Sequence, residues 1–417
     1  MGGAIRDALL GHPHSDWDLA TSATPAEVRE IFGARRTIPV GVEFGTVGVL
    51  DRDGTMHEVT TFRRDVKTDG RHAEVEFGVS LDDDLARRDF TINAIAYSPK
   101  TRELRDPFGG QRDLRAKLVR AVGNADARMR EDRLRALRAI RFAARFDFSI
   151  EMHTAGAIAA SAPFLGRLSP ERVKQELDKT MEQVRCPSAA LRIWKASGAF
   201  ATLLPELARL PDDAFDVVDY LAMPRSPTRP ARRASRYAGL LLRLTPEGAA
   251  SILTGLRASK HETQAVVALI ERWHKLGADI RQALMRDDPP TDVDVRRWIA
   301  SIGRLQVGTF MRLASAVCHA EGASGRPAPS RARVHALHRR MTRSAFRDVV
   351  DLGGLAVDGD DLRRAGIRPG PGLGKILQTL LVEVLEDPAR NTTDWLLQEA
   401  QRLHAALPPE AERQRGN

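Results

Sequence analysis

One change of pattern along the chain constrains its fold more than any other feature. Up to about residue 120, apolar and β-branched stretches alternate with turn residues, as in a mixed α/β domain. From about residue 121 onward, apolar residues recur at helical spacing, as in DRLRALRAIRFAARF at 132–146. Because 417 residues exceed what one hydrophobic core organises, we expect more than one domain. The sequence therefore predicts an α/β head followed by a long α-helical remainder.

Local signals predict a few elements in more detail. Two strand-like runs within 40–62 flank Asp53-Gly54, which predicts a β-hairpin. Residues 22–32 combine a capping residue, a proline near the first turn and apolar periodicity, which predicts a short helix. Three segments rich in proline, glycine, serine, aspartate or arginine predict linkers or loops, at 223–235, 286–292 and 321–333.

The positive charge of the chain leaves two interpretations open. The formal net charge is +9, and arginine supplies most of the positive charge. This charge reflects either an arginine-rich genome with a solvated surface or a polyanionic partner, since arginine binds phosphates bidentately.

No apolar run approaches the ~20 residues of a membrane span, and no export signal is recognisable. With only two cysteines, in no metal or disulfide pattern, the sequence predicts a cytoplasmic protein without membrane contact.

Two carboxylates near the start of the chain are candidate metal ligands. Asp16 and Asp18 flank a tryptophan, and on a strand residues i and i+2 share a face. Carboxylate pairs of this kind hold Mg²⁺, whose other positions are filled by water and substrate phosphates. A Gly-Gly pair and Arg6 precede them, which suits a phosphate group close to the backbone. An exposed strand would also explain the two carboxylates, and Glu58 is either a third ligand or an exposed strand residue.

Two arginine-rich segments follow. Arg87, Arg88 and Asp89 precede an apolar run and either cap a helix or clamp a phosphate.

In the second segment, Glu131, Arg135 and Arg138 would share one helix face, with Asp132 and Arg141 beside them. They form either an ion-pair ladder on a solvated helix or a surface that presents donors and acceptors to a base. An Asp and an Arg held by one another would read the Watson–Crick edges of both C and A.

Seven segments, in this order along the chain, carry a family resemblance: GGAIRDALLG…DWDLAT (2–21), FRRDVKTDGRHAEVEF (62–77), ARRDFTINAIAY (86–97), DPFGGQRDL (106–114), EDRLRALRAIRFAARFDFSI (131–150), SPERVKQELDKTM (169–181) and DGDDLRRAGIRPGPGLGKILQTLL (358–381). They resemble the motifs of bacterial class II tRNA nucleotidyltransferases, the family of CCA-adding enzymes and bacterial poly(A) polymerases.

The resemblance implies a DNA-polymerase-beta-like palm in the head, followed by an elongated all-α neck, body and tail. The implied boundaries are 1–120 for the head, 121–182 for the neck, 183–285 for the body and 286–417 for a tail that binds tRNA. Family members carry a helix and a strand before the Gly pair, so an N-terminal strand of the head is expected to be missing. The implied flexible loop, Asp65–Glu76, would help the enzyme switch from CTP to ATP.

The resemblance also assigns roles by position. Asp16 and Asp18 would bind Mg²⁺ and act as the catalytic carboxylates. Three residues would contact the phosphates or sugar of the incoming nucleotide, namely Gly3, Arg6 and Arg88. Five residues would form a protein template for the base, namely Glu131, Asp132, Arg135, Arg138 and Arg141. Of these, Asp132 and Arg135 would read the base.

The implied activity is template-independent addition of CCA to the 3′ end of tRNA from CTP and ATP, with release of pyrophosphate. The implied partner is tRNA, contacted at its 3′ end and its acceptor and T-arm region, with no obligate protein partner. A poly(A) polymerase shares the head and neck motifs, and CC-only or A-only enzymes share much of the chain. A non-catalytic RNA-binding protein of the same fold would have lost the carboxylates or the base-reading pair, which are all present here.

Overall fold

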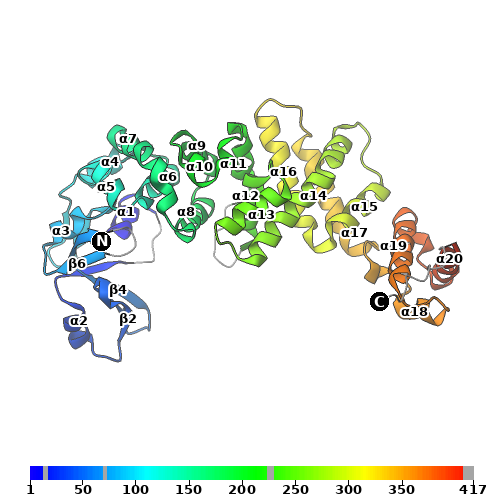
Figure 1. Cartoon of the computed structure of the whole chain (residues 1–417), viewed down its shortest axis with the longest axis horizontal. Helices are drawn as coiled ribbons and strands as arrows, with labels where there is room; N and C mark the ends of the chain where they lie inside the picture. Colours follow the sequence, from blue (N-terminus) through cyan, green and yellow to red (C-terminus); the bar gives the residue numbers. More distant parts are fainter. Residues whose placement is uncertain (13–16, 69–72, 223–229, 407–417) are drawn as a thin grey trace, which may run out of the picture. The chain divides into compact units, whose positions relative to one another are not determined.

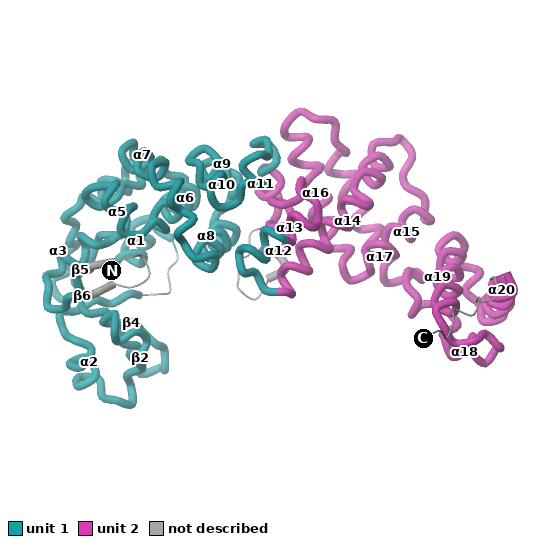
Figure 2. Tube along the Cα trace, in the orientation of Figure 1, with its two compact units in different colours: residues 1–215, 223–228, 251–259 teal, residues 216–222, 229–250, 260–417 magenta. Residues whose placement is uncertain are grey.

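The computed structural model describes residues 1–12, 17–68, 73–222 and 230–406. It divides into two compact units (Figure 2). Unit 1 comprises residues 1–215 and 251–259 among those described, and unit 2 comprises 216–222, 230–250 and 260–406. The finer division into head, neck, body and tail, and the missing N-terminal strand, stay predictions.

A four-stranded sheet lies near the start of unit 1 (Figure 1), in the order β1-β4-β3-β2. Its strands are β1 (Leu19–Thr21), β2 (Thr37–Gly41), β3 (Thr46–Leu50) and β4 (Met56–Thr61). β1 runs parallel to β4, and the other neighbours are antiparallel. The hairpin predicted around Asp53-Gly54 is confirmed as β3–β4, with Gly54 in the left-handed region that its turn requires.

The helix predicted within 22–32 is confirmed as α2 (Pro25–Phe32). It begins there because Thr24 and Glu27 form a reciprocal capping box and Pro25 occupies the first turn. Val28 of α2 is buried against the sheet, in a cluster with Val47, Val49 and Val59.

The segment 65–76 contributes to an antiparallel hairpin of β5 (Arg63–Thr68) and β6 (Ala73–Phe77). Short elements complete the α/β part: α1 (Gly3–Leu9), η1 (Val42–Phe44), α3 (Leu81–Ala86), η2 (Thr91–Asn93), β7 (Ala96–Ser98), β8 (Glu103–Arg105), α4 (Gly110–Arg115), β9 (Leu118–Val119) and β10 (Ser149–Ile150). Leu85, Ala94, Ala96 and Val122 form a buried cluster beneath them.

Helices dominate the rest of the chain. The first set is α5 (Ala125–Glu131), α6 (Leu134–Phe146), α7 (Met152–Ser161), η3 (Ala162–Arg167), α8 (Pro170–Gln183), α9 (Pro187–Ala196), α10 (Ala199–Leu203), α11 (Pro205–Ala208) and η4 (Asp212–Tyr220). The second set is α12 (Pro230–Leu241), α13 (Pro246–Gly255), α14 (Lys260–Met285), α15 (Asp292–Ile302), η5 (Arg304–Gln306), α16 (Val307–Ala323), α17 (Arg331–Arg347), η6 (Leu352–Gly354), α18 (Gly359–Arg364), α19 (Pro371–Glu386), η7 (Pro388–Arg390) and α20 (Thr393–Ala406).

The single helix predicted over 132–146 is wrong at its start. α5 ends at Glu131, and Asp132 adopts an extended backbone (φ −147°, ψ 107°) before α6 begins at Leu134. Of the predicted linkers, 286–292 separates α14 from α15 except for its last residue, which begins α15, and only the middle of 321–333, residues 324–330, separates α16 from α17. Residues 223–229 lie outside the described part of the chain, and 230–235 belong to α12 rather than to a linker.

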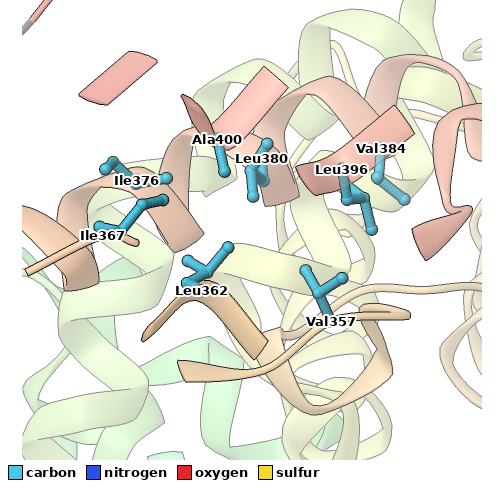
Figure 3. Packing of buried hydrophobic residues seen from close by; sticks show 8 residues of the cluster. All are labelled: Val357, Leu362, Ile367, Ile376, Leu380, Val384, Leu396 and Ala400. Carbon is cyan, nitrogen blue, oxygen red and sulfur yellow. The ribbon is translucent and has the colours of Figure 1, made fainter. Parts of the chain in front are cut away.

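The C-terminal helices of unit 2 enclose their own small core (Figure 3). α18, α19 and α20 contribute six of its buried side chains, namely Leu362, Ile376, Leu380, Val384, Leu396 and Ala400, and Val357 and Ile367 on either side of α18 complete it. Among the described residues, no helix is both long enough and apolar enough to span a bilayer.

Candidate functional site

An open cavity of roughly 700 Å³ in unit 1 brings together residues that lie far apart in the sequence. Its lining comes from α1, the segment before η2, α6 and α8, and cations outnumber carboxylates there. The cavity collects eight of the ten predicted site residues: Gly3, Arg6, Asp18, Arg88, Asp132, Arg135, Arg138 and Arg141. Of the other two, Glu131 ion-pairs with Arg135 beside the cavity, and Asp16 lies outside the described residues.

Arg6 is a buried cation at the floor of this cavity. Its Nη1 donates to Oδ1 of Asn93 at 2.5 Å, and its Nε donates to Oδ1 of Asp7 at 2.7 Å. The guanidinium lies 5.0 and 4.8 Å from the ring centres of Phe142 and Phe146. Burial lowers the pKa of Arg6 from its ordinary value. These contacts hold one positive charge in a fixed orientation.

The arginine pair at 87–88 is anchored by Asp84, which sequence reasoning missed. The Asp84 side chain is 1% exposed, and its Oδ1 accepts hydrogen bonds from Nε and Nη2 of Arg87 at 2.9 and 2.8 Å. Nη2 of Arg88 lies 3.5 Å from Oδ2 of the same carboxylate. The run of three aspartates at 82–84, just before the arginine pair, could have predicted a carboxylate partner for it.

Arg88 is positioned by backbone as well. Its Nη1 donates to the carbonyl of Asn93 at 3.3 Å. Gly2, at φ 69°, packs so closely that a Cβ atom added to it would overlap Nη1 of Arg88. The first glycine of the pair therefore makes room for the guanidinium, and burial lowers the pKa of Arg88 from its ordinary value.

Arg138 of α6 reaches back to Asp89. Its Nε donates to Oδ2 of Asp89 at 2.8 Å, and Asp89 also accepts from Nδ2 of Asn93 at 2.9 Å and from the backbone N–H of Phe90 at 2.8 Å. Burial alone would raise the pKa of Asp89, but Arg138 and these hydrogen bonds outweigh it and hold the pKa below its usual value. The same ion pair raises the pKa of Arg138 despite its burial.

The predicted pairing of Asp132 with Arg135 is wrong. Asp132 accepts a hydrogen bond from Nη2 of Arg172 on α8 at 2.7 Å, and its Oδ1 accepts from the backbone N–H of Leu134. Arg135 instead donates to Oε2 of Glu131 at 2.7 Å and to the carbonyl of Arg87 at 3.1 Å. Asp132 has an extended backbone between α5 and α6, whereas the predicted i,i+4 neighbours Glu131 and Arg135 still form an ion pair across this break. The spacing of residues along the sequence did not predict the contact between Arg172 and Asp132.

Arg141 is held by a second carboxylate that sequence reasoning missed. Its Nε donates to Oε2 of Glu176 on α8 at 2.7 Å, and the Glu176 side chain is 1% exposed. The Arg141 guanidinium also lies 4.3 Å from the ring centre of Phe142. Burial lowers the pKa of Arg141. The Glu176 contact therefore fixes α8 against α6 at the cavity.

Asp18 is the described carboxylate suited to a metal ion. It directly precedes β1, is exposed, and lines the cavity that holds the arginines. Because Leu19 pairs with Val59 across the parallel strands, Glu58 occupies the neighbouring position on β4. An exposed carboxylate beside a basic cavity fits Mg²⁺, which accepts few protein ligands. Within the described residues, no group of three or more His, Cys, Asp or Glu side chains forms a metal cluster.

The chain is similar to known proteins over nearly its whole length. A family model described as the poly A polymerase head domain matches residues 1–120, and one described as a probable RNA- and SrmB-binding site of polymerase A matches 147–210. A CCA-adding enzyme of Latilactobacillus sakei is 33% identical over 402 residues, covering 96% of this chain and 92% of that enzyme. A CCA-adding enzyme of Geobacillus kaustophilus is 34% identical over 411 residues, covering 97% of this chain and 93% of that enzyme.

Among solved structures, the Bacillus stearothermophilus CCA-adding enzyme in complex with CTP has a TM-score of 0.76 and 28% identity, covering 97% of this chain and 94% of that one. The predicted fold, an α/β nucleotidyltransferase head followed by a helical remainder, is thereby confirmed. The likeness to relatives extends along nearly the whole of both chains. The chain belongs to the family of CCA-adding enzymes, nucleotidyltransferases that share their head domain with poly(A) polymerases.

Proposed function

We propose that this protein adds CCA to the 3′ end of tRNA, using CTP and ATP and releasing pyrophosphate. The observation that carries the proposal is the convergence of eight candidate site residues on one basic cavity, in a chain of this family. A reaction that consumes tRNA, CTP and ATP belongs in the cytoplasm, which is the location expected from the sequence.

The cavity suits nucleotidyl transfer because it offers positive charge where a triphosphate would gain charge. Arg6 and Arg88, both held by fixed partners, would bind the triphosphate oxygens and stabilise the pyrophosphate as it leaves. The 3′-oxygen of the tRNA attacks the α-phosphorus and forms a new O–P bond. The bond between the α-phosphorus and the oxygen that bridges it to the β-phosphorus breaks, and pyrophosphate leaves. The cavity contributes mainly by positioning the two reactants in line.

Members of this family generally depend on a divalent metal ion. Asp16 and Asp18 would hold Mg²⁺, and a metal bound there would lower the pKa of the attacking hydroxyl and offset charge on the phosphates. Asp18 lies in the cavity lining, which supports its part in this assignment. Glu58 is a candidate for a further ligand because it neighbours Asp18 across β1 and β4.

Base recognition would use Asp132 and Arg135 after they leave their present partners. Each is bound to another charged side chain, Asp132 to Arg172 and Arg135 to Glu131. A nucleotide base would have to compete with these ion pairs, so only a base that satisfies both side chains would be bound well. Arg138 and Arg141 would act as supports for this surface, because their hydrogen-bonding atoms are directed at Asp89 and Glu176.

Poly(A) addition and partial CC or A addition are less well supported. The relatives that match this chain over most of their length are CCA-adding enzymes. The hairpin β5–β6 occupies the segment that the resemblance links to the switch from CTP to ATP. A non-catalytic RNA-binding role is disfavoured because the basic cavity and its carboxylates are retained.

The test uses the purified protein, Mg²⁺ and a tRNA that ends at its discriminator base. CTP alone, ATP alone and both together are supplied, and products are resolved at single-nucleotide length. We expect two additions with CTP and a third only when ATP is present. A long ladder with ATP alone would identify a poly(A) polymerase, and a permanent stop after two additions would identify a CC-adding enzyme. No addition on any substrate would refute the proposal.

A further inference from the structure

The arginines that line the cavity of unit 1 differ in how firmly their guanidinium groups are held. Six of the eight donate at least one hydrogen bond of 2.8 Å or shorter to a protein acceptor, namely Arg6, Arg87, Arg135, Arg138, Arg141 and Arg172. The other two are Arg88, whose contacts are 3.3 and 3.5 Å long, and Arg145. Arg145 therefore shares its loose attachment with an arginine that is proposed to bind the triphosphate.

Both hydrogen bonds of Arg145 are long. Its Nη2 donates to Oδ2 of Asp7 at 3.4 Å and its Nη1 donates to Oε1 of Gln183 at 3.3 Å, whereas charge-assisted hydrogen bonds are usually about 2.7 to 2.9 Å long. Its Nε has no acceptor among the residues that the structure describes. Asp7 already has a closer partner in Arg6, at 2.7 Å, and does not need Arg145 to balance its charge. The guanidinium of Arg145 is therefore available to a ligand.

The position of Arg145 on α6 places it at one end of the cavity. Arg138, Arg141 and Arg145 follow one another at spacings of three and four, so they share a helix face, and all three line the cavity. Arg135, a proposed base-reading residue, lies ten positions earlier, which corresponds to about 15 Å along the helix. Arg145 is thus remote from the end of the cavity where the base is proposed to bind.

The residues around Arg145 belong to the phosphate end of the cavity. The ring centre of Phe146 lies 4.9 Å from the guanidinium of Arg145 and 4.8 Å from that of Arg6, the buried arginine proposed to bind the triphosphate. Asp7 accepts hydrogen bonds from both arginines. One aromatic ring and one carboxylate therefore place Arg145 beside Arg6.

Positive charge is in excess at this end of the cavity. Arg6, Arg141 and Arg145 share two carboxylates, Asp7 and Glu176. Burial lowers the pKa of Arg6 and of Arg141, and the charge of Arg145 lowers both further. Like charges crowded in this way repel one another in the free protein, and a bound anion relieves the repulsion.

We propose that Arg145 binds the β- and γ-phosphates of the incoming nucleotide and holds the pyrophosphate after it forms. The inference rests on the proposed function for the identity of the ligand as a nucleoside triphosphate. Arg145 exchanges its two long hydrogen bonds for shorter ones to phosphate oxygens, while Asp7 keeps Arg6 as its partner. Its contact is with the phosphates that CTP and ATP have in common, so it adds affinity without distinguishing the bases.

The experiment measures binding of CTP, CDP, CMP and pyrophosphate to the full chain by calorimetry, with Mg²⁺ and without tRNA. The variant is R145Q, since glutamine keeps helix propensity and removes the charge. The matched control is R167Q. Arg167 also lies over a phenylalanine ring of unit 1, 5.2 Å from the centre of Phe164, but it is exposed and absent from the cavity lining. Thermal unfolding of both variants checks that the fold is kept.

We expect R145Q to weaken binding of CTP and of pyrophosphate about tenfold and binding of CMP by less than about twofold. CDP should show an intermediate loss, because it lacks the γ-phosphate. The variant R145K should recover part of the CTP affinity, since lysine keeps the charge but not the two-pronged donor. The control R167Q should bind all four ligands within about twofold of the wild-type chain.

The addition assay gives a second readout that a purely structural role would not produce. R145Q should raise KM for CTP and for ATP by the same factor, and it should weaken inhibition by added pyrophosphate. The preference for CTP and ATP over UTP and GTP should stay as in the wild-type chain, because Arg145 lies far from the base-reading residues.

Two results would overturn the proposal. Equal weakening of CTP and CMP by R145Q would show that Arg145 only supports the shape of the cavity. Unchanged CTP and pyrophosphate binding would show that Arg145 does not contact these phosphates, and weaker tRNA binding in that variant would assign it to the RNA strand instead. Failure of the proposed function is distinguishable, because the wild-type chain would then add no nucleotide to tRNA, whereas the binding comparison needs no tRNA.

Discussion

Arg138 and Asp89, separated by 49 positions in the chain, form an ion pair in which Nε and Nη2 of the arginine lie 2.8 and 2.7 Å from one carboxylate oxygen. Asp89 directly follows the arginine pair proposed to bind the triphosphate, and Arg138 lies on the helix proposed to present the base-reading residues. The pair therefore joins the phosphate side of the cavity to its base side. Disturbing it should affect both folding and the alignment of the nucleotide.

Asp89→Asn should lower the free energy of unfolding of unit 1 by about 2 kcal/mol, because it leaves the partly buried Arg138 without its nearest counter-charge. Asparagine keeps the volume and an acceptor for Asn93 and Phe90. Denaturant unfolding measures the loss. Asp82→Asn is the control, since Asp82 makes an exposed pair with Arg105 and should cost less than about 1 kcal/mol. Equal losses in the two variants would contradict the assignment.

The same pair should make stability depend on pH in acid. The pKa of Asp89 is lower in the folded protein than its usual value of 3.8. Its contribution is therefore complete above about pH 4 and is lost as the pH falls through the folded pKa. Unfolding of wild type and Asp89→Asn at a series of pH values should give a constant difference from pH 7 to about 5 that shrinks only in stronger acid. A difference that already shrinks between about pH 7 and 6 would implicate another group.

Gly2→Ala should weaken nucleotide binding more than it weakens folding. The added Cβ would displace the guanidinium of Arg88, which can move, and the positive φ of residue 2 adds strain of about 1 kcal/mol. We expect a higher KM for CTP and ATP. Gly110→Ala provides the contrast, because its Cβ would meet the carbonyl of Thr91, and backbone cannot move aside. That variant should lower the melting temperature, and a Gly2→Ala protein with unchanged KM would refute the proposed role of Arg88.

Arg172→Gln should change base selection. It removes the ion pair that holds Asp132 at 2.7 Å, and this partly exposed pair contributes about 1 kcal/mol. We expect the preference for CTP and ATP over UTP and GTP to change about five- to tenfold in kcat/KM. Lys174→Gln is the control on the same helix, since Lys174 pairs with Asp178 and is absent from the cavity lining. Uniform loss of activity with all four nucleotides would indicate a purely structural role.

Asp18→Asn should abolish nucleotide addition while leaving tRNA binding and unfolding nearly unchanged, because Asp18 is exposed and its role is proposed to be metal binding. The expected loss in kcat is about a thousandfold or more, and added Mg²⁺ should not restore it. Glu58→Gln tests the candidate third ligand beside it. An Asp18→Asn protein of normal activity would exclude Asp18 as a metal ligand.

Particular elements show how far the sequence alone predicts the fold. The hairpin at Asp53-Gly54 and the helix after Thr24 are set by contacts within a few residues, and both are confirmed. The helix predicted over 132–146 begins two residues late, because the extended backbone of Asp132 separates α5 from α6. Local periodicity predicted the helix but not that break.

The sequence by itself determined which residues would gather at the cavity, since eight of the ten singled out line it. Only the tertiary structure decided how they are paired. Arg172 and Glu176 hold Asp132 and Arg141, and both come from a helix 35 or more positions away from these partners. The strength of an ion pair depends on the distance between its two charges in space. The spacing of charged residues along the sequence therefore does not fix their partners once separate helices pack together. The motifs therefore specify the chemistry of the cavity, and the packing of α8 against α6 specifies its geometry.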